Sequence, residues 1–273
     1  MTIDILICTI DDGVGSVRQV LMPPAPDVHY VVSVQHSRPL DEMSAAWRTA
    51  VDALALRDDV TLTTLEGRGL SRNRNNALCH AKADIVIIAD DDCRYHPDNI
   101  ARVQRAYTDC PQADIVCFAA EGYDGTPLKR YPTASLAYAE ACKQGYYPTS
   151  FELTFRRKAF VGAALSFNEH YGLGAPRFTA GEEEVLLADA ERAGLKVVFV
   201  PEVITQTDAA TTGRAFLRDA RLQVTKGAVF RHRFGLAAAL WRTLKEGAYH
   251  LVYNHANPLP IWFNMLQGIG ASR

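Results

Sequence analysis

The sequence predicts an α/β protein built on a mostly parallel central sheet flanked by helices. Segments of strand length alternate with segments of helical periodicity over residues 1–207. The strand-like segments, such as "IDILICTI" at 3–10 and "DIVIIA" at 84–89, are apolar at consecutive positions rather than at every second one. A strand that is apolar on both faces is typical of a parallel sheet covered by helices on both sides.

The expected elements of the first half alternate regularly. Ser71 is expected to open a helix, because a serine oxygen at an N-cap accepts a hydrogen bond from a first-turn N–H. Pro97 lies near the first turn of another, where proline is tolerated. The expected strands are 3–10, 29–35, 59–66 and 84–89, and the expected helices are 13–21, 40–56, 71–83 and 96–107.

The second half continues the alternation and then changes character. Gly194 should stop a helix, and Pro201 should end the last strand. The expected strands are 113–120, 150–160 (with a short helix) and 195–201, and the expected helix is 181–194. Beyond residue 208 we expect helices and a loose segment "NPLPIW". The chain should therefore hold a sheet domain over 1–207 and a helical extension over 208–273.

Composition narrows the class of protein. The chain has 273 residues, of which 48% are hydrophobic and 22% charged, as in ordinary globular proteins. The net charge of −2 implies no general attraction to nucleic acid. Six scattered cysteines without a C-x-x-C pair favour a reducing cytoplasm. We expect no signal peptide and no membrane-spanning segment, because the start lacks a basic region and no apolar run reaches about 18 residues.

Three carboxylates, Asp90, Asp91 and Asp92, directly follow the strand 84–89. Two such charges 4 Å apart repel by about 4 kcal/mol at an effective dielectric near 20. Ligands of open α/β sheets lie beyond the carboxyl ends of the strands. The cluster therefore indicates a Mg²⁺ or Mn²⁺ site completed by phosphate oxygens. The alternative is a solvated acidic turn before the next helix.

Two arginines, Arg72 and Arg74, lie in the first turn of the helix expected at 71–83. A helix N-terminus is partially positive, so cations there are unfavourable unless an anion binds. A diphosphate would supply that anion. The alternative is that both guanidinium groups point to solvent or pair with Glu66 or another acid.

A glycine-rich segment, 171–181, leads into a helix through Glu182, Glu183 and Glu184. Acids in a first turn are favoured by the helix dipole, which is a purely structural explanation. Beside a metal–diphosphate site, one of them becomes a candidate general base. Other motifs are incomplete: Arg18 replaces the third glycine of a dinucleotide fingerprint in "GVGSVR", and neither a P-loop nor a G-x-S-x-G elbow occurs.

Four stretches, taken in order, resemble the family 2 glycosyltransferases, which have the GT-A fold. They are "ILICTIDD", "GLSRNRNNAL", "IADDDCRYHPD" and "GLGAPRFTAGEEEVLLADAERAGLKVVFVPEV", and they span about residues 3 to 205. The third resembles the DxD motif of that family. The resemblance is closest to bacterial enzymes that build capsule, lipopolysaccharide or other surface glycans.

This resemblance implies an inverting, metal-dependent transfer of a sugar from a nucleotide-diphosphate sugar to a hydroxyl of a glycan or lipid-linked acceptor. Mn²⁺ or Mg²⁺ would be the cofactor. The implied metal ligands are Asp92, Asp90 and Asp208; the implied donor-binding residues are Thr9, Asp11, Gln35, Arg72, Arg74, Asp90 and Asp91; and the implied catalytic residues are Glu183 and Glu182. The Gly-Glu-Asp pattern of the family, counted from Gly181, implies that Glu183 is the base. Glu184 should then be mostly solvated, and Glu182 should cap the loop or bind acceptor.

The sequence departs from the family pattern at two places. The second strand ends in "VQHSRP", so Gln35 or His36 stands where an aspartate usually holds the nucleotide base. After the last core strand, "ITQTDAATTG" offers Thr207 and Asp208 where the family often has a histidine. Asp208 or the downstream His232 would have to replace it.

The segment 214–245 carries eight basic residues against Asp219 alone. It is either a solvated helical face or a surface for an anionic partner, such as a membrane or a lipid-diphosphate acceptor. The first alternative would leave the protein cytoplasmic, and the second would associate it with the inner face of the membrane.

Two other functions remain open from the sequence. A metal-dependent nucleotidyltransferase shares this layout, although it usually carries a basic, glycine-rich loop after the first strand. A non-catalytic nucleotide-sugar-binding protein would have lost the DxD motif or the base, and both are present here.

Overall fold

The computed structural model describes residues 1–208 and 215–272. The chain forms two compact units, which are described separately. The first comprises Met1–Arg68, Arg72–Ser166 and Asp189–Ala209, and the second comprises Gly69–Ser71, Phe167–Ala188 and Ala210–Arg273. The domain boundary expected after residue 207 stays a prediction.

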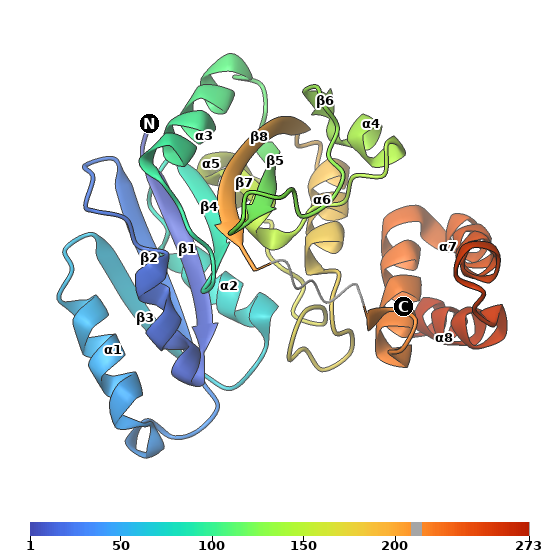
Figure 1. The fold of residues 1–273 in the computed structure, drawn as a ribbon, viewed down its shortest axis with the longest axis horizontal. Helices are drawn as coiled ribbons and strands as arrows, with labels where there is room; N and C mark the ends of the chain where they lie inside the picture. The colour runs from blue at the N-terminus through green and yellow to red at the C-terminus, as the bar shows by residue number, and fades with distance from the viewer. Residues whose placement is uncertain (209–214, 273) are drawn as a thin grey trace. The chain divides into compact units, whose positions relative to one another are not determined.

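The first unit contains an eight-stranded sheet in the order β3-β2-β1-β4-β7-β5-β8-β6 (Figure 1). The strands β1 to β4 run parallel to one another, as do β5 and β8, whereas β7 and β6 run antiparallel to their neighbours. The bounds are β1 Ile3–Ile10, β2 Val28–His36, β3 Val60–Glu66, β4 Ile85–Asp90, β5 Ile115–Gly122, β6 Leu136–Ala137, β7 Leu153–Arg156 and β8 Val197–Thr207. The predicted mostly parallel central sheet is confirmed.

The helices follow the predicted alternation with small differences. The expected helix at 13–21 is a 3₁₀ helix, and the expected helix at 40–56 is divided, because the Ser44 hydroxyl caps α1 by accepting from the Trp47 N–H. The bounds are η1 Asp11–Gln19, η2 Leu40–Glu42, α1 Ala45–Ala55, α2 Leu70–His80, α3 Pro97–Asp109, α4 Tyr138–Lys143, η3 Ser150–Glu152, α5 Arg157–Gly162, α6 Glu182–Arg192, α7 Ala220–Asn254 and α8 Pro258–Ala271.

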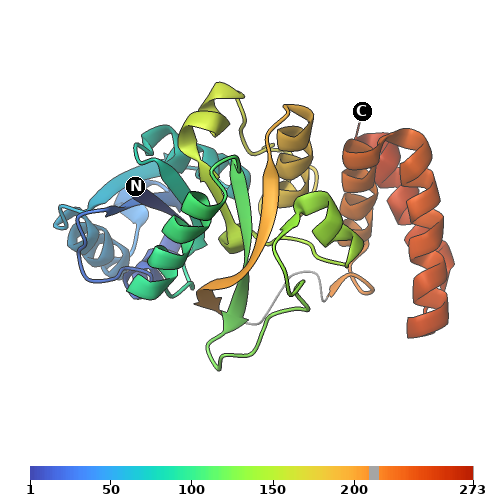
Figure 2. The same ribbon diagram turned by 90° about the horizontal axis from the view of Figure 1, so that it is seen from above.

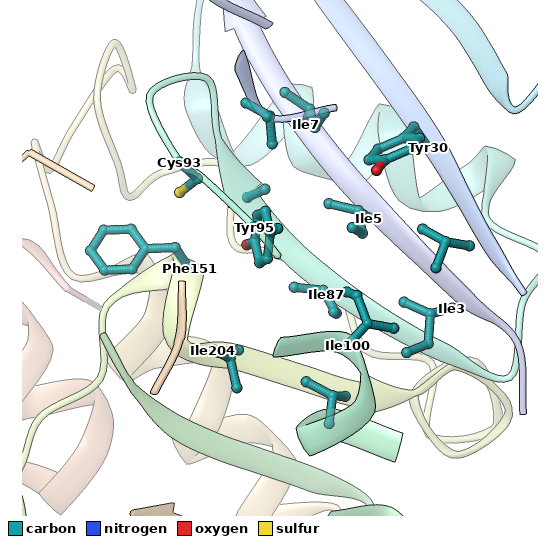
Figure 3. Packing of buried hydrophobic residues seen from close by; sticks show 14 of the residues in the cluster. Ile3, Ile5, Ile7, Tyr30, Ile87, Cys93, Tyr95, Ile100, Phe151 and Ile204 are labelled. Carbon is teal, nitrogen blue, oxygen red and sulfur yellow. The ribbon is translucent and has the colours of Figure 1, made fainter. Parts of the chain in front are cut away.

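The main core lies between one face of the sheet and the segments η1, α1 and α3 (Figure 2). Side chains alternate across a strand, so Ile3, Ile5 and Ile7 of β1 all point into this layer (Figure 3). They pack with Ile87 of β4 and Ile100 of α3. All five are at least nine-tenths buried, and each such side chain contributes about 1.5–3 kcal/mol on burial. The core thus fixes β1 and β4 as neighbours.

Three local predictions are wrong, each for a physical reason. Helix α2 begins at Leu70, so Ser71 is not its N-cap; the Ser71 hydroxyl instead donates to the Tyr171 carbonyl at 2.6 Å.

Strand β8 continues past Pro201, because the ladder with β5 is irregular there and no backbone donor is needed from proline. The segment 257–262 opens α8, with Asn257 as the N-cap and Pro258 in the first turn.

In the second unit, helices α7 and α8 pack through glycines (Figure 1). A Cβ added to Gly227 of α7 would lie 2.0 Å from the Met265 carbonyl oxygen, and one added to Gly268 of α8 would lie 1.8 Å from that of Val224. Helix α7 is interrupted at Gly235, whose φ of 77° is not helical. The predicted C-terminal helical extension is confirmed. Within the described ranges, no helix is long and apolar enough to span a membrane.

Candidate functional site

The carboxyl ends of β1, β2 and β4 form the reversal point of the sheet order, where β1 lies between β2 and β4. Such a point leaves a crevice for ligands, because the connecting segments leave it in opposite directions. Cys8 of β1 is paired in register with Asp90 of β4, and Ile10 with Gln35 of β2. The sheet therefore brings together the predicted residues of three separate stretches.

Asp90 is held by Arg74. The Arg74 guanidinium is 1% exposed, and its Nη2 lies 3.0 Å from Asp90 Oδ1. The Ser150 hydroxyl donates to the other carboxylate oxygen at 3.3 Å. A buried arginine needs such a partner, since an uncompensated charge there is costly. The predicted proximity of the basic helix start and the acidic cluster is thus present for Arg74.

Asp91 points toward the end of β1. Its carboxylate accepts a hydrogen bond from the Thr9 hydroxyl. Burial raises the pKa of Asp91, the charges of Asp90 and Asp92 raise it further, and the Thr9 bond opposes them. Gly13 leaves room for this contact, because a Cβ there would lie 2.8 Å from Asp91 Oδ2.

Asp92 lies beside the end of β8. Burial and the Asp90 charge raise the pKa of Asp92, whereas a hydrogen bond with the Thr207 side chain lowers it. The charge of Asp208 also acts on it. The Tyr123 hydroxyl donates to the Asp92 carbonyl oxygen and so ties the loop after β5 to this cluster.

The carboxylates at this strand end are of the chemical type that a hard divalent cation prefers, although within the described residues they do not form a complete three-ligand site. Burial raises the pKa of both Asp91 and Asp92, and the charge of Asp90 raises both further, a repulsion that a cation would relieve. Carboxylate oxygens are the ligands that Mg²⁺ and Mn²⁺ prefer. Among the residues that the structure describes, no three His, Cys, Asp or Glu side chains gather as a complete metal site.

Asp11 follows the end of β1, and Gln35 lies near the end of β2, the neighbouring strand. Asp11 has a left-handed φ of 50°, and its two carboxylate oxygens accept from the Ser37 N–H and hydroxyl, both at 2.7 Å. Burial acts to raise the pKa of Asp11, but these bonds lower it overall. Gln35 is 2% exposed, and its Nε2 has no hydrogen-bond partner within residues 1–208 and 215–272. His36 is also buried, with Nδ1 2.9 Å from the Arg38 carbonyl oxygen.

Arg72 differs from Arg74. It is exposed, and its Nη1 donates to the Glu66 carbonyl oxygen at 2.8 Å. The sequence left open that Arg72 points to solvent or pairs with Glu66. In the structure it contacts Glu66, but through the backbone carbonyl and not the carboxylate. Cys8 of β1 is buried, and burial raises the pKa of its thiol to about 12.

Asn73 supports the site and was not predicted. Its Nδ2 donates to the carbonyl oxygens of Thr9 at 3.0 Å and Ser33 at 3.1 Å, and its Oδ1 accepts from the Ser33 hydroxyl at 2.6 Å. It therefore joins α2 to β1 and β2. The one signal in the sequence was its position between Arg72 and Arg74.

The three glutamates belong to the second unit and open α6. Glu182 is 5% exposed, and Gly172 leaves it room, since a Cβ there would lie 3.3 Å from Glu182 Cδ. Glu183 is partly exposed. Glu184 is not mostly solvated as expected: its side chain is 34% exposed and lies 3.7 Å from Arg233. Burial raises its pKa, although Arg233 and Lys226 oppose that. The three acids point in different directions, as their helical spacing requires.

Comparison with known families supports the resemblance drawn from the sequence. Residues 40–167 match glycosyl transferase family 2. The predicted resemblance to the family 2 glycosyltransferases is confirmed. The matched segment holds Arg74 and Asp90–Asp92, whereas Glu182–Glu184 lie after it. No curated protein matches the chain.

Solved glycosyltransferase structures share the fold. Residues 1–349 of TarS from S. aureus match with a TM-score of 0.65 at 12% identity, covering 98% of this chain and 81% of that one. The same region in complex with UDP-GlcNAc matches with a TM-score of 0.63 at 12% identity. The match covers 98% of this chain and 82% of that one. The mannosyltransferase PcManGT from Pyrobaculum calidifontis, in complex with GDP-Man and Mn²⁺, matches with a TM-score of 0.59 at 16% identity. The match covers 98% of this chain and 86% of that one. The predicted GT-A fold is confirmed by these neighbours, and the family match over residues 40–167 indicates a transferase.

Proposed function

We propose that this protein is an inverting glycosyltransferase that moves a sugar from a nucleotide-diphosphate sugar to an acceptor hydroxyl in bacterial surface-glycan synthesis. The observation that carries the proposal is the buried Arg74 paired with Asp90, beside Asp91 and Asp92, at the reversal point of the sheet. A cation and an arginine at one strand end suit a diphosphate leaving group.

The donor is a nucleotide sugar. TarS has been solved with UDP and with UDP-GlcNAc, and PcManGT with GDP-Man, which supports this donor class here. Thr9 and Asp11 line the nucleotide side, and Asp91 approaches the ribose. Gln35 offers a buried amide donor, without a partner among the described residues, for a carbonyl of the base. Its position at the end of β2 is where the family usually places an aspartate.

Asp92, Asp90 and Asp208 would hold the metal, although in the described residues they do not gather as a complete three-ligand site. Because Arg74 and Ser150 already contact the Asp90 carboxylate, Asp92 would be the main ligand of the metal. Mn²⁺ or Mg²⁺ would neutralise charge on the departing diphosphate. Arg74 carries the rest of that charge stabilisation, and Arg72 joins it after leaving the Glu66 carbonyl.

The transfer is a single displacement at the anomeric carbon. The acceptor oxygen forms the new bond there as the bond to the diphosphate breaks, and the electron pair of that bond stays on the nucleoside diphosphate. The acceptor proton passes to the Glu183 carboxylate. Glu182 is the other candidate, and its deep burial suits a role in holding the loop 171–181 or the acceptor.

The acceptor is a glycan or a lipid-linked sugar, and the protein works at the inner face of the membrane. Basic residues of 214–245 would provide the peripheral contact. Of these, Arg214 lies outside the described residues.

Release of nucleoside diphosphate from UDP- and GDP-sugars tests the proposal. We expect turnover with Mn²⁺, loss of turnover with EDTA, and loss in Asp92→Asn. Asp98→Asn, at an exposed acid in the first turn of α3, is the matched control and should stay active. Release of pyrophosphate from a nucleoside triphosphate plus a sugar phosphate would instead show a nucleotidyltransferase.

A further inference from the structure

The second half of α7, after the break at Gly235, carries an exposed apolar stripe. Its members recur at spacings of four and three residues: Ala237, Trp241, Leu244, Ala248 and Leu251. Trp241 is 64% exposed, and Leu244 and Leu251 are about half exposed, at 51% and 50%. Side chains at this spacing share one face of a helix. An exposed apolar stripe of this length indicates a binding surface.

The stripe faces away from the helix contact within this unit. Ala239, Thr243 and Gly247 are the buried residues of this half of α7. Gly247 packs against the indole of Trp262 in α8, and a Cβ there would lie 2.0 Å from its Nε1. The helix therefore has small residues where it meets α8 and large apolar residues on the opposite side. This is the reverse of an ordinary surface helix, which turns its large apolar residues inward.

Charges beside the stripe are basic. Arg242 and Lys245 are exposed and one turn apart. The one acid of this half-helix, Glu246, is engaged by Lys226 at 2.5 Å and by His250 at 3.2 Å. From Gly247 to Ser272 the sequence contains no Asp, Glu, Lys or Arg. The surface thus joins apolar and aromatic groups to uncancelled positive charge.

We propose that this stripe inserts into the interface of an anionic bilayer, with Trp241 and Leu244 in the acyl boundary and Arg242 and Lys245 at the phosphates. The inference rests on the membrane contact proposed above and assigns it to the apolar stripe together with two of the eight basic residues of 214–245, Arg242 and Lys245. Apolar insertion combined with headgroup attraction is how amphipathic helices bind membranes.

The charge pattern favours a bilayer over a second copy of the chain. A seam between two copies would present the basic side chains of both, and like charges disfavour that contact. A spanning role is also disfavoured. The stripe belongs to α7, and within the described residues no helix is long and apolar enough to cross a membrane.

Flotation of the full chain with vesicles tests the stripe. We expect binding to phosphatidylcholine mixed with phosphatidylglycerol and little to phosphatidylcholine alone. The double variant Trp241→Ser/Leu244→Ser should lose at least about tenfold in partitioning. Trp241→Phe should retain most of it. Leu56→Ser is the matched control, because Leu56 is an 85% exposed apolar residue of the first unit. Arg242→Gln/Lys245→Gln should remove the preference for anionic lipid.

Unchanged flotation of the Trp241→Ser/Leu244→Ser variant would overturn the proposal, as would absence of binding by the natural chain. A dimer in sedimentation that this variant dissociates, with no flotation, would assign the stripe to a second copy instead. Thermal unfolding of the variant should match that of the natural chain. Nucleoside diphosphate release without vesicles should also be unchanged, so loss of that activity would concern the proposed function and not the stripe.

Discussion

At the scale of single residues, the candidate site depends on satisfied partners. Arg74 is among the largest fully buried side chains of the chain, and such a guanidinium is retained only where an acid compensates it. Asp90 does so, while Thr9 engages Asp91. Each carboxylate of the cluster thus has a different neighbour, which allows three adjacent acids to take different roles.

Replacing Arg74 should destabilise the protein as well as weaken donor binding. Arg74→Met leaves Asp90 without its cation, and because Asp90 is 32% exposed we expect a loss of about 2 kcal/mol in the free energy of unfolding. Arg72→Met removes an exposed guanidinium two residues away and should cost less than about 0.5 kcal/mol. Urea unfolding measures both. Equal losses would show that the Arg74–Asp90 pair is not structurally important.

Substitutions of single residues would decide which of the glutamates is the base. Glu183→Gln should reduce sugar transfer by at least about a hundredfold while donor affinity stays nearly constant, because it removes only the proposed proton acceptor. Glu184→Gln should stay active, since Glu184 is engaged by Arg233. Transfer rates and donor titration measure the two effects. A dead Glu182→Gln together with an active Glu183→Gln would move the base to Glu182.

At the scale of elements, apolar runs predicted most of the sheet. Strands β1 to β4 and helix α3 were expected within a few residues, because each has its own local signal. Local sequence patterns could not predict the contacts between residues that are distant in the sequence. Pro201 lies inside β8 only because the β5 ladder is irregular there. Ser150 reaches Asp90 from 60 residues away, across β7, so no spacing marks it.

Helix α8 offers a test of glycine packing. Gly268→Ala would place a Cβ 1.8 Å from the Val224 carbonyl oxygen, which forces α7 and α8 apart. We expect a loss of about 2–3 kcal/mol in stability of this unit. Gly270→Ala, in the same helix with no atom within 4 Å of its Cβ, should be neutral or stabilising by up to about 1 kcal/mol. Limited proteolysis and thermal unfolding follow both. Similar behaviour of the two variants would contradict close packing of the helices.

At the scale of the whole molecule, charge is unevenly distributed. The total is −2, although 214–245 holds eight basic residues and one acid, so the rest of the chain is acidic. An acidic remainder is an unexpected setting for a diphosphate unless local cations offset it. Arg74 is one such cation in the carboxylate cluster, and a bound metal would be another.

Metal and nucleotide should therefore stabilise the protein only together. A ligand that binds the folded state at a hundred times its Kd adds about 2.7 kcal/mol, which for a chain of this size raises Tm by several degrees. We expect that shift with UDP or GDP plus Mn²⁺, and little with either nucleotide in EDTA, since the acidic cluster repels a bare diphosphate. Asp92→Asn should reduce the shift because it removes the proposed main metal ligand, and Asp98→Asn should retain it. An equal shift in EDTA would mean that arginine alone carries the diphosphate, and Asp92 would then lose its assigned role.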